Sequence, residues 1–94
     1  MKPSLLFEWD SGKAQSNLRK LGVSFDEAAT VFADPFALTI IDAEHGRDEV
    51  RELTLGSSYW SRLVVVYHTD SQGRIRIISA RKADKGEVAQ YHDR

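Results

Sequence analysis

The chain has 94 residues, a hydrophobic fraction of 41% and a formal net charge of −1. This length supports one modest hydrophobic core, so we expect residues 1–94 to form a single domain. The chain contains no cysteine, which excludes a disulfide scaffold and a thiolate metal site. The apolar run at residues 5–7 is too short for a signal peptide or a membrane span, so we expect a cytoplasmic protein without membrane contact.

Charge is unevenly distributed along the chain. Residues 1–50 contain five Lys or Arg and nine Asp or Glu, a balance of −4, whereas residues 51–94 contain eight and five, a balance of +3. A fold that gathers the second half on one face would attract phosphates. An ordinary mixed surface explains the same counts, so charge alone leaves both interpretations open.

The N-terminal part predicts a strand and a helix. Residues 5–9 are short, apolar and bulky, as expected for a strand. Asp10 or Ser11 is a suitable helix N-cap, and Gly22 is a suitable stop. The apolar stripe of this helix has helical spacing and consists of Ala14, Leu18 and Leu21.

A second helix follows at once. Ser24 and Glu27 have the spacing of a capping box, and Asp34-Pro35 ends the helix. Its apolar positions at helical spacing are Phe25, Ala28, Ala29 and Phe32.

The second half predicts β-strands and one more helix. Asp70–Gly73 is expected to be a four-residue hairpin loop, and Asp84 with Glu87 opens a short helix to about His92. The resulting order, β-α-α-β-β-β-β-α, predicts an α+β fold: an antiparallel sheet of four to five strands with two N-terminal helices and a short C-terminal one. One face of that sheet is expected to be free for function. The expected strands are residues 37–42, 50–55, 63–69 and 74–81.

Common enzymatic motifs do not appear. His45, His68 and His92 are scattered without metal-site spacing, and there is no phosphate-binding glycine loop, nucleophile elbow or Rossmann fingerprint. We therefore expect no metal and no cofactor. The remaining cations, loop histidine and tyrosines match metal-free RNA cleavage by a 2′-hydroxyl, which needs a base, an acid and cations for the developing charge.

Four residues are candidates for this chemistry. Arg51 and Arg81 could each bind two phosphate oxygens, although ion pairs with Glu8, Asp10 or Glu52 are an equal alternative. His45 has a suitable pKa range for acid–base work, although a loop histidine is often only a polar surface residue. Tyr91 could place a hydroxyl nearby, although packing against the sheet is an alternative.

Strand alternation predicts which neighbours these arginines have. Arg51 shares a face with Leu53 and Leu55, which is unusual for a charged residue. Arg81 ends the last strand on the same parity as Ser79, Ile77 and Ile75. Tyr67 and His68 lie on the central strand, so one of them must face inward, and we interpret both as mainly structural. Phe7 and Trp9 are expected in the core.

Motifs along nearly the whole chain resemble one family, the BrnT toxins. The resemblance begins with FEWD at residues 7–10 and continues with GVSFDEA at 22–28 and VFADP at 31–35. RIRIISARKA at residues 74–83 extends it through the last strand and basic turn. Further matching positions are Lys13, Asn17, Asp42, His45, Arg51, Gly56, Glu87 and Tyr91.

The resemblance implies a RelE-like fold and a ribonuclease that arrests translation as the toxin of a bacterial type II toxin–antitoxin pair. A small BrnA-like antitoxin with a DNA-binding part would neutralise it in a two-to-two complex. Operator DNA would be contacted only through that antitoxin. The residues expected to bind RNA or phosphate are Lys13, Asn17, Lys20, Arg76, Ser79 and Lys82.

Two departures from the family pattern leave a second function open. Leu21 stands where the family commonly has histidine, and the last helix opens with the weakly basic DKGEVA at residues 84–89. Fewer cations weaken an electrostatic hold on RNA. The alternative function is a non-catalytic or weakly active binding module that acts with its antitoxin as an operon repressor.

Overall fold

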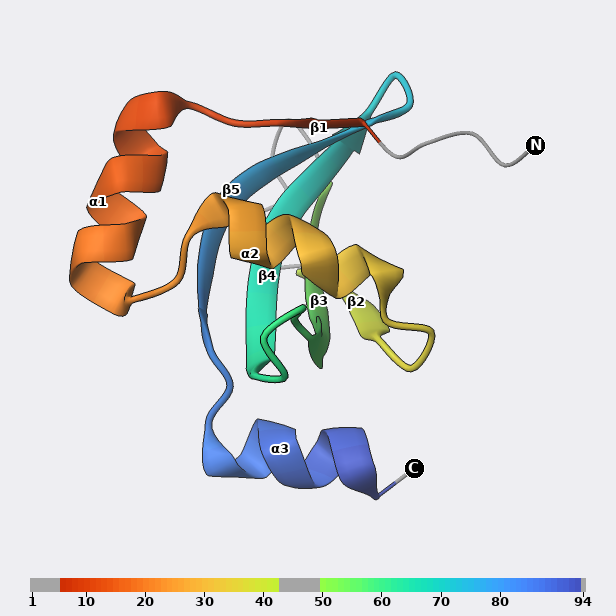
Figure 1. The fold of residues 1–94 in the computed structure, drawn as a ribbon. Helices are drawn as coiled ribbons and strands as arrows, with labels where there is room; N and C mark the ends of the chain where they lie inside the picture. Colours follow the sequence, from red (N-terminus) through yellow and green to blue (C-terminus); the bar gives the residue numbers. More distant parts are fainter. Residues whose placement is uncertain (1–5, 43–49, 94) are drawn as a thin grey trace.

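The computed structural model describes residues 6–42 and 50–93 (Figure 1). Its elements follow the predicted order, with a short 3-10 turn added after the second helix. Within these ranges, no helix is long and apolar enough to cross a membrane. The elements are β1 (Leu6–Glu8), α1 (Ser11–Leu21), α2 (Phe25–Thr30), η1 (Val31–Ala33), β2 (Leu38–Asp42), β3 (Arg51–Ser57), β4 (Leu63–Ser71), β5 (Arg74–Lys82) and α3 (Lys85–His92).

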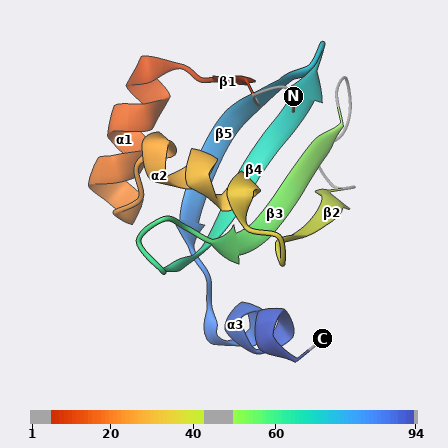
Figure 2. The ribbon, with the colours of Figure 1, turned by 45° about the vertical axis from the view of Figure 1, so that its right-hand side comes forward.

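The strands form a five-stranded sheet in the order β1-β5-β4-β3-β2 (Figure 2). Strands β2 to β5 pair antiparallel, as expected for consecutive strands. The α+β prediction is confirmed with one refinement, since β1 runs parallel to β5 and the sheet is therefore mixed. Consecutive reversals fix only the directions of β2 to β5, whereas β1 reaches the sheet through two helices and can pair either way.

Helix α1 begins and ends where the sequence predicts. Asp10 caps its first turn, and Gly22 closes it with a φ of 73°, in the left-handed region that suits glycine. The predicted apolar stripe is wrong in part, because Leu18 and Leu21 are 51% and 46% exposed whereas Asn17 is buried. The helix lies close to β5 along the side that carries Asn17, so only a narrow strip of α1 is covered.

Helix α2 has half of the predicted capping box. Ser24 Oγ accepts the backbone N–H of Glu27 at 3.0 Å, as expected. The carboxylate of Glu27 turns away from Ser24 and binds Ser58 and Arg62 instead. A guanidinium is a stronger partner for a buried carboxylate than a backbone N–H, which explains the difference.

The core lies between α1 and α2 and one face of the sheet (Figure 1). Phe7 and Trp9 pack against it, as predicted, and the Trp9 ring meets Phe25 edge to face at 5.9 Å. Because α1 and α2 cover this face, the opposite face of the sheet, here called the open face, is left to α3 and solvent. The core residues are Val23, Phe25, Ala28, Val31, Val64, Val66, Ile77 and Ala80.

The turn between β4 and β5 is tighter than predicted. The two strands pair as far as Ser71 and Arg74, so only Gln72 and Gly73 remain in the turn. Their φ angles of 52° and 77° are both left-handed, as a two-residue type I′ hairpin requires. The expected four-residue loop is wrong because Asp70 and Ser71 continue the strand.

A β-bulge in β5 overturns the parity predicted for its side chains. The pairing with β4 passes over Ile78, so one extra residue is inserted at this point. Simple alternation placed Arg81 with Ile77 and Ile75, but the bulge separates them. Ile77 is 1% exposed in the core, whereas Arg81 and Arg76 both reach the open face.

Candidate functional site

The open face carries four of the polar residues predicted to act on RNA. Residues that lie directly opposite each other on neighbouring strands point to the same face of the sheet. On the open face, three such rows of residues run across β3, β4 and β5. These rows are Arg51–Thr69–Arg76, Leu53–Tyr67–Ser79 and Leu55–Val65–Arg81. We use the name arginine face for Arg51, Tyr67, Arg76, Ser79 and Arg81.

Arg51 and Arg81 lie at opposite corners of the arginine face. They lie two rows apart along the strands and two strands apart across the sheet. With standard strand dimensions, this separates their Cα atoms by roughly 16 Å. Arg51 is partly buried, and its Nε has no hydrogen-bond partner in residues 6–42 and 50–93. The Arg81 side chain bonds to α3, beyond the other end of the strands, so the two guanidiniums do not converge.

Arg81 is engaged through both terminal nitrogens. Nη1 donates to Glu87 Oε1 at 2.8 Å and to the Lys82 carbonyl at 3.3 Å, and Nη2 donates to Glu87 Oε2 at 2.8 Å and to the Tyr67 hydroxyl at 3.4 Å. The Glu87 carboxylate raises the pKa of Arg81, and Arg81 in turn lowers the pKa of Glu87. The predicted phosphate ligand therefore already binds a carboxylate, although not one of those expected from the sequence.

Glu87 also caps α3. Asp84 Oδ1 accepts the backbone N–H of Glu87 at 2.8 Å, and Glu87 Oε1 accepts that of Asp84 at 2.9 Å, which confirms the predicted capping box. Helix α3 has no buried residue. Side-chain bonds, among them the pair of Arg81 with Glu87, therefore contribute much of its attachment to the sheet.

Lys82 and Tyr91 meet at a different place, a shallow depression between the β3–β4 loop and α3. The Tyr91 hydroxyl donates to Asp34 Oδ2 at 2.6 Å, and the same oxygen accepts the backbone N–H of Ser57 at 2.8 Å. His92, which sequence reasoning did not select, joins them; its only signal was its place beside Tyr91 in the last helix. We use the name terminal basin for Ser57, Ser61, Lys82, Tyr91 and His92.

The three candidates on α1 form a separate group. Lys13 and Lys20 are exposed beside a shallow depression that Asn17 also lines. Asn17 itself is buried: Nδ2 donates to the carbonyls of Val23 and Ala80 at 2.9 and 2.8 Å, and Oδ1 accepts the Ala80 N–H at 3.2 Å. These bonds attach α1 to β5 and occupy both ends of the amide. A role of the two lysines in RNA binding stays a prediction.

The histidines differ in position. His45 lies outside the described residues, so its role stays a prediction. His68 faces inward, with Nε2 at 2.7 Å from Thr54 Oγ1 and its ring edge to face with Phe32 at 4.8 Å. Burial lowers the pKa of His68, so its imidazole is neutral at pH 7. Across residues 6–42 and 50–93, no group of three or more His, Cys, Asp or Glu could hold a metal ion.

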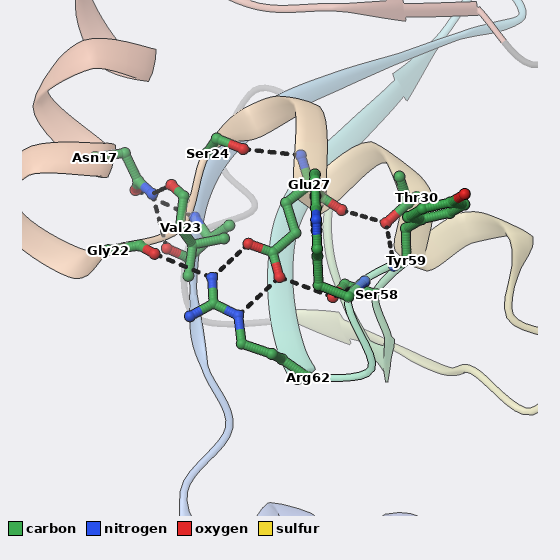
Figure 3. A network of polar contacts seen from close by, with 11 residues as sticks. Asn17, Gly22, Val23, Ser24, Glu27, Thr30, Ser58, Tyr59 and Arg62 are labelled. Carbon is green, nitrogen blue, oxygen red and sulfur yellow. Dashed lines mark hydrogen bonds and ion pairs between the residues drawn. The ribbon is translucent and has the colours of Figure 1, made fainter.

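Sequence reasoning missed a polar network centred on Glu27 (Figure 3). This carboxylate is 4% exposed and accepts from Ser58 Oγ at 2.7 Å, from Arg62 Nε at 2.9 Å and from Arg62 Nη2. The bonds from Arg62 lower the pKa of Glu27. The available signal was its position between the core residues Phe25 and Ala28, where a carboxylate needs a cationic partner.

The fold and the arginine face define a class, the small α+β domains with a cationic face on a mixed sheet. The structure is similar to the 1.1 Å crystal structure of the Brucella abortus ribonuclease toxin BrnT, with a TM-score of 0.63 and 18% sequence identity. The match covers 87% of this chain and 100% of that chain. At this identity it shows a shared fold.

The sequence identifies the family within that class. Residues 9–87 match the family described as the ribonuclease toxin BrnT of type II toxin–antitoxin systems, so the chain belongs to the BrnT family. This confirms the resemblance seen in the motifs and implies an antitoxin partner. None of the curated proteins compared with the chain matches it by sequence.

Proposed function

We propose that residues 1–94 act as one toxin domain in the cytoplasm, which cleaves RNA without a metal ion and thereby inhibits translation. The observation that carries the proposal is the arginine face: the bulge in β5 brings Arg76 and Arg81 to the same surface as Arg51, in a chain of the BrnT family. Guanidiniums on a sheet face that α3 covers at one end suit the phosphates of a nucleic-acid strand.

In the proposed reaction, the ribose 2′-oxygen attacks the adjacent phosphorus and the 5′-oxygen of the next nucleotide leaves. Arg81 stabilises the negative charge that develops on the phosphoryl oxygens. Arg51 lies too far from Arg81 to reach the same phosphate and binds another phosphate of the strand. His45 is the proposed base and Tyr91 the proposed acid. Tyr91 now donates to Asp34, so this role requires its hydroxyl to exchange that acceptor for the leaving oxygen.

Arg81 can bind a phosphate only when Glu87 yields its place. The exchange replaces one oxyanion by another, so the charge on Arg81 stays compensated. Arg76 is more readily available, because its contact with Glu8 at 3.3 Å is exposed and weak. The proposed contacts to flanking RNA backbone are Lys13, Asn17, Lys20, Ser79 and Lys82, of which Asn17 would first have to leave its bonds to the fold.

A BrnA-like antitoxin is the proposed partner. Covering the arginine face would neutralise the toxin, because RNA and antitoxin then compete for one surface. We further propose a two-to-two complex that reaches operator DNA only through the DNA-binding part of the antitoxin. Size-exclusion chromatography of the complex tests the stoichiometry. Repeating it with operator DNA, for the complex and for the toxin alone, tests whether DNA binding needs the antitoxin.

Cleavage of RNA in the presence of EDTA tests the proposed reaction. The products should carry 2′,3′-cyclic phosphate and 5′-hydroxyl ends. Arg81→Ala should lower the rate by about 100-fold, as expected for the loss of one charge-stabilising donor. Arg51→Ala should weaken RNA binding, as expected for the loss of one phosphate contact. Arg19→Ala on α1 removes the same charge at an exposed position away from the sheet and should have little effect. Intact RNA, or cleavage that survives loss of Arg81, contradicts the proposal.

The engaged state of Arg81 favours a second candidate function, a toxin-like module that binds its antitoxin and represses the operon without cleaving RNA. Induced expression without the antitoxin separates the two. Growth arrest that Arg81→Ala relieves supports the ribonuclease. Normal growth, together with promoter binding that needs both proteins, supports the repressor module.

A further inference from the structure

The loop between β3 and β4 presents two aromatic side chains to solvent. Tyr59 is 80% exposed and Trp60 is 59% exposed. Their rings meet edge to face, with centroids 5.9 Å apart and planes at 79°. Neither ring belongs to the core, so packing does not account for this pair.

Hydrogen bonds attach this loop to α2 and to its own residues (Figure 3). The backbone N–H of Tyr59 donates to Thr30 Oγ1 at 2.8 Å, and that of Trp60 donates to Ser58 Oγ at 3.2 Å. Ser61 N–H donates to the Ser58 carbonyl at 2.9 Å, and Ser61 has a φ of 62°, which is unfavourable for a serine. A loop held in this way loses little conformational entropy when it binds a ligand.

A buried charge supports the same loop. Ser58 Oγ, which accepts from Trp60, itself donates to Glu27 at 2.7 Å, and Arg62 at the end of the loop is paired with Glu27. Removing a carboxylate from water is unfavourable unless it is paired, so this network must be complete for the fold to tolerate it. The Glu27 network thus anchors the loop on both sides of the two exposed rings, through Ser58 and Arg62.

The aromatic pair adjoins the terminal basin. Ser61, directly after Trp60, lines that basin together with Lys82 and His92. Trp60 also lines a second open depression, together with Leu18 and Arg62. An extended strand whose backbone passes Lys82 could therefore place a neighbouring base against the rings.

These surroundings favour single-stranded RNA over a protein as the occupant. Stable protein interfaces bury about 800 Å² on each partner, far more than two exposed rings supply. Alternating cations and aromatic rings are instead the usual composition of surfaces that bind single strands, where bases stack on the rings and cations contact the phosphates.

We propose that Trp60, supported by Tyr59, stacks on an unpaired base of the RNA next to a phosphate bound by Lys82. The inference rests on the proposed function, because it assigns a subsite for the same substrate. The two aromatic residues select for unpaired bases, and the site would bind single strands better than duplexes.

Binding of a fluorescently labelled, 2′-O-methylated RNA oligonucleotide, which cannot be cleaved, tests the proposal. The wild-type protein should bind it, and Trp60→Ala should weaken binding roughly tenfold, as expected for loss of one base-stacking contact. Trp60→Phe should retain most of the affinity. Leu18→Ala is the matched control, because it removes an exposed apolar side chain from the same depression without removing a ring. Circular dichroism verifies that each variant is folded.

Unchanged RNA affinity in Trp60→Ala overturns the inference. If Trp60→Ala keeps RNA binding but no longer binds the antitoxin, the loop is a protein-docking site instead. Replacement of individual nucleotides by abasic ones provides a second measurement: at the stacked position it should abolish the difference between wild type and Trp60→Ala. Failure of the proposed function gives a different pattern, in which the oligonucleotide binds through Trp60 but unmodified RNA is not cleaved.

Discussion

Glu87→Gln is the most direct perturbation of the arginine face, because Glu87 occupies the nitrogens with which Arg81 would bind a phosphate. The substitution preserves shape and can keep an acceptor for the Asp84 N–H. It replaces a two-point ion pair by a hydrogen bond from the guanidinium to a neutral amide oxygen. Hydrogen bonds to charged groups contribute about 1.5–3 kcal/mol, but these side chains are 33% and 23% exposed. Solvent screening therefore reduces the expected loss of stability to roughly 1 kcal/mol.

Glu87→Gln should strengthen RNA binding by about the same free energy as it removes from folding stability. A ligand no longer has to displace the Glu87 carboxylate, and 1 kcal/mol corresponds to about a fivefold gain in affinity. Fluorescence anisotropy with a 2′-O-methylated oligonucleotide at fixed salt measures it. Glu52→Gln on β3 removes the same charge elsewhere and serves as the control. If both variants change affinity equally, or Glu87→Gln weakens binding, then Arg81 and Glu87 form a structural pair and Arg81 is not an RNA ligand.

Three further predictions concern the fold. Asn17→Ala should destabilise the protein by about 2–4 kcal/mol in urea unfolding, because it leaves backbone groups of Val23 and Ala80 unpaired. Gly56→Ala should lower stability by about 1–3 kcal/mol in the same assay, since its Cβ would lie 2.9 Å from Val31 Cγ1. The pKa of His68 is lowered by burial, so its contribution is complete above about pH 6.5 and declines below it as the unfolded chain takes up a proton first. Urea titrations from pH 7.5 to 5 should show a decline in wild type that is smaller in His68→Gln; equal slopes would contradict this.

The helices and their ends could be predicted because short-range chemistry determines them. Asp10 and Gly22 bound α1, and the reciprocal pair of Asp84 and Glu87 opens α3, each at the expected residue. The buried face of α1 was harder to predict. Hydrophobicity selected Leu18, but the helix is attached to β5 by the amide of Asn17 and leaves Leu18 exposed. Such a long-range polar contact has no periodic signature in the sequence.

The composition of the site could be predicted, but not its geometry. Alternation assigns faces by counting residues, so one inserted residue, Ile78, moves every position on one side of it to the other face. Nothing in the run of apolar residues marks Ile78 as the extra one, since pairing with β4 decides it. The partner of Arg81 was missed for a related reason. The expected carboxylates, Glu8, Asp10 and Glu52, lie far from Arg81 in the sequence. Glu87, which binds Arg81, is only six residues further along the chain, in the capping box of α3.

Helix α3 links the two groups of candidate residues. Glu87 connects it to Arg81 on the open face, and Tyr91 connects it to Asp34 beside the terminal basin. Because α3 buries no residue of its own, displacing it breaks mainly these side-chain bonds. An RNA phosphate that takes Arg81 from Glu87 would loosen the helix that also positions Tyr91 and His92. An antitoxin that holds α3 in place would keep Arg81 paired, and so could inhibit the toxin without covering every arginine on the sheet.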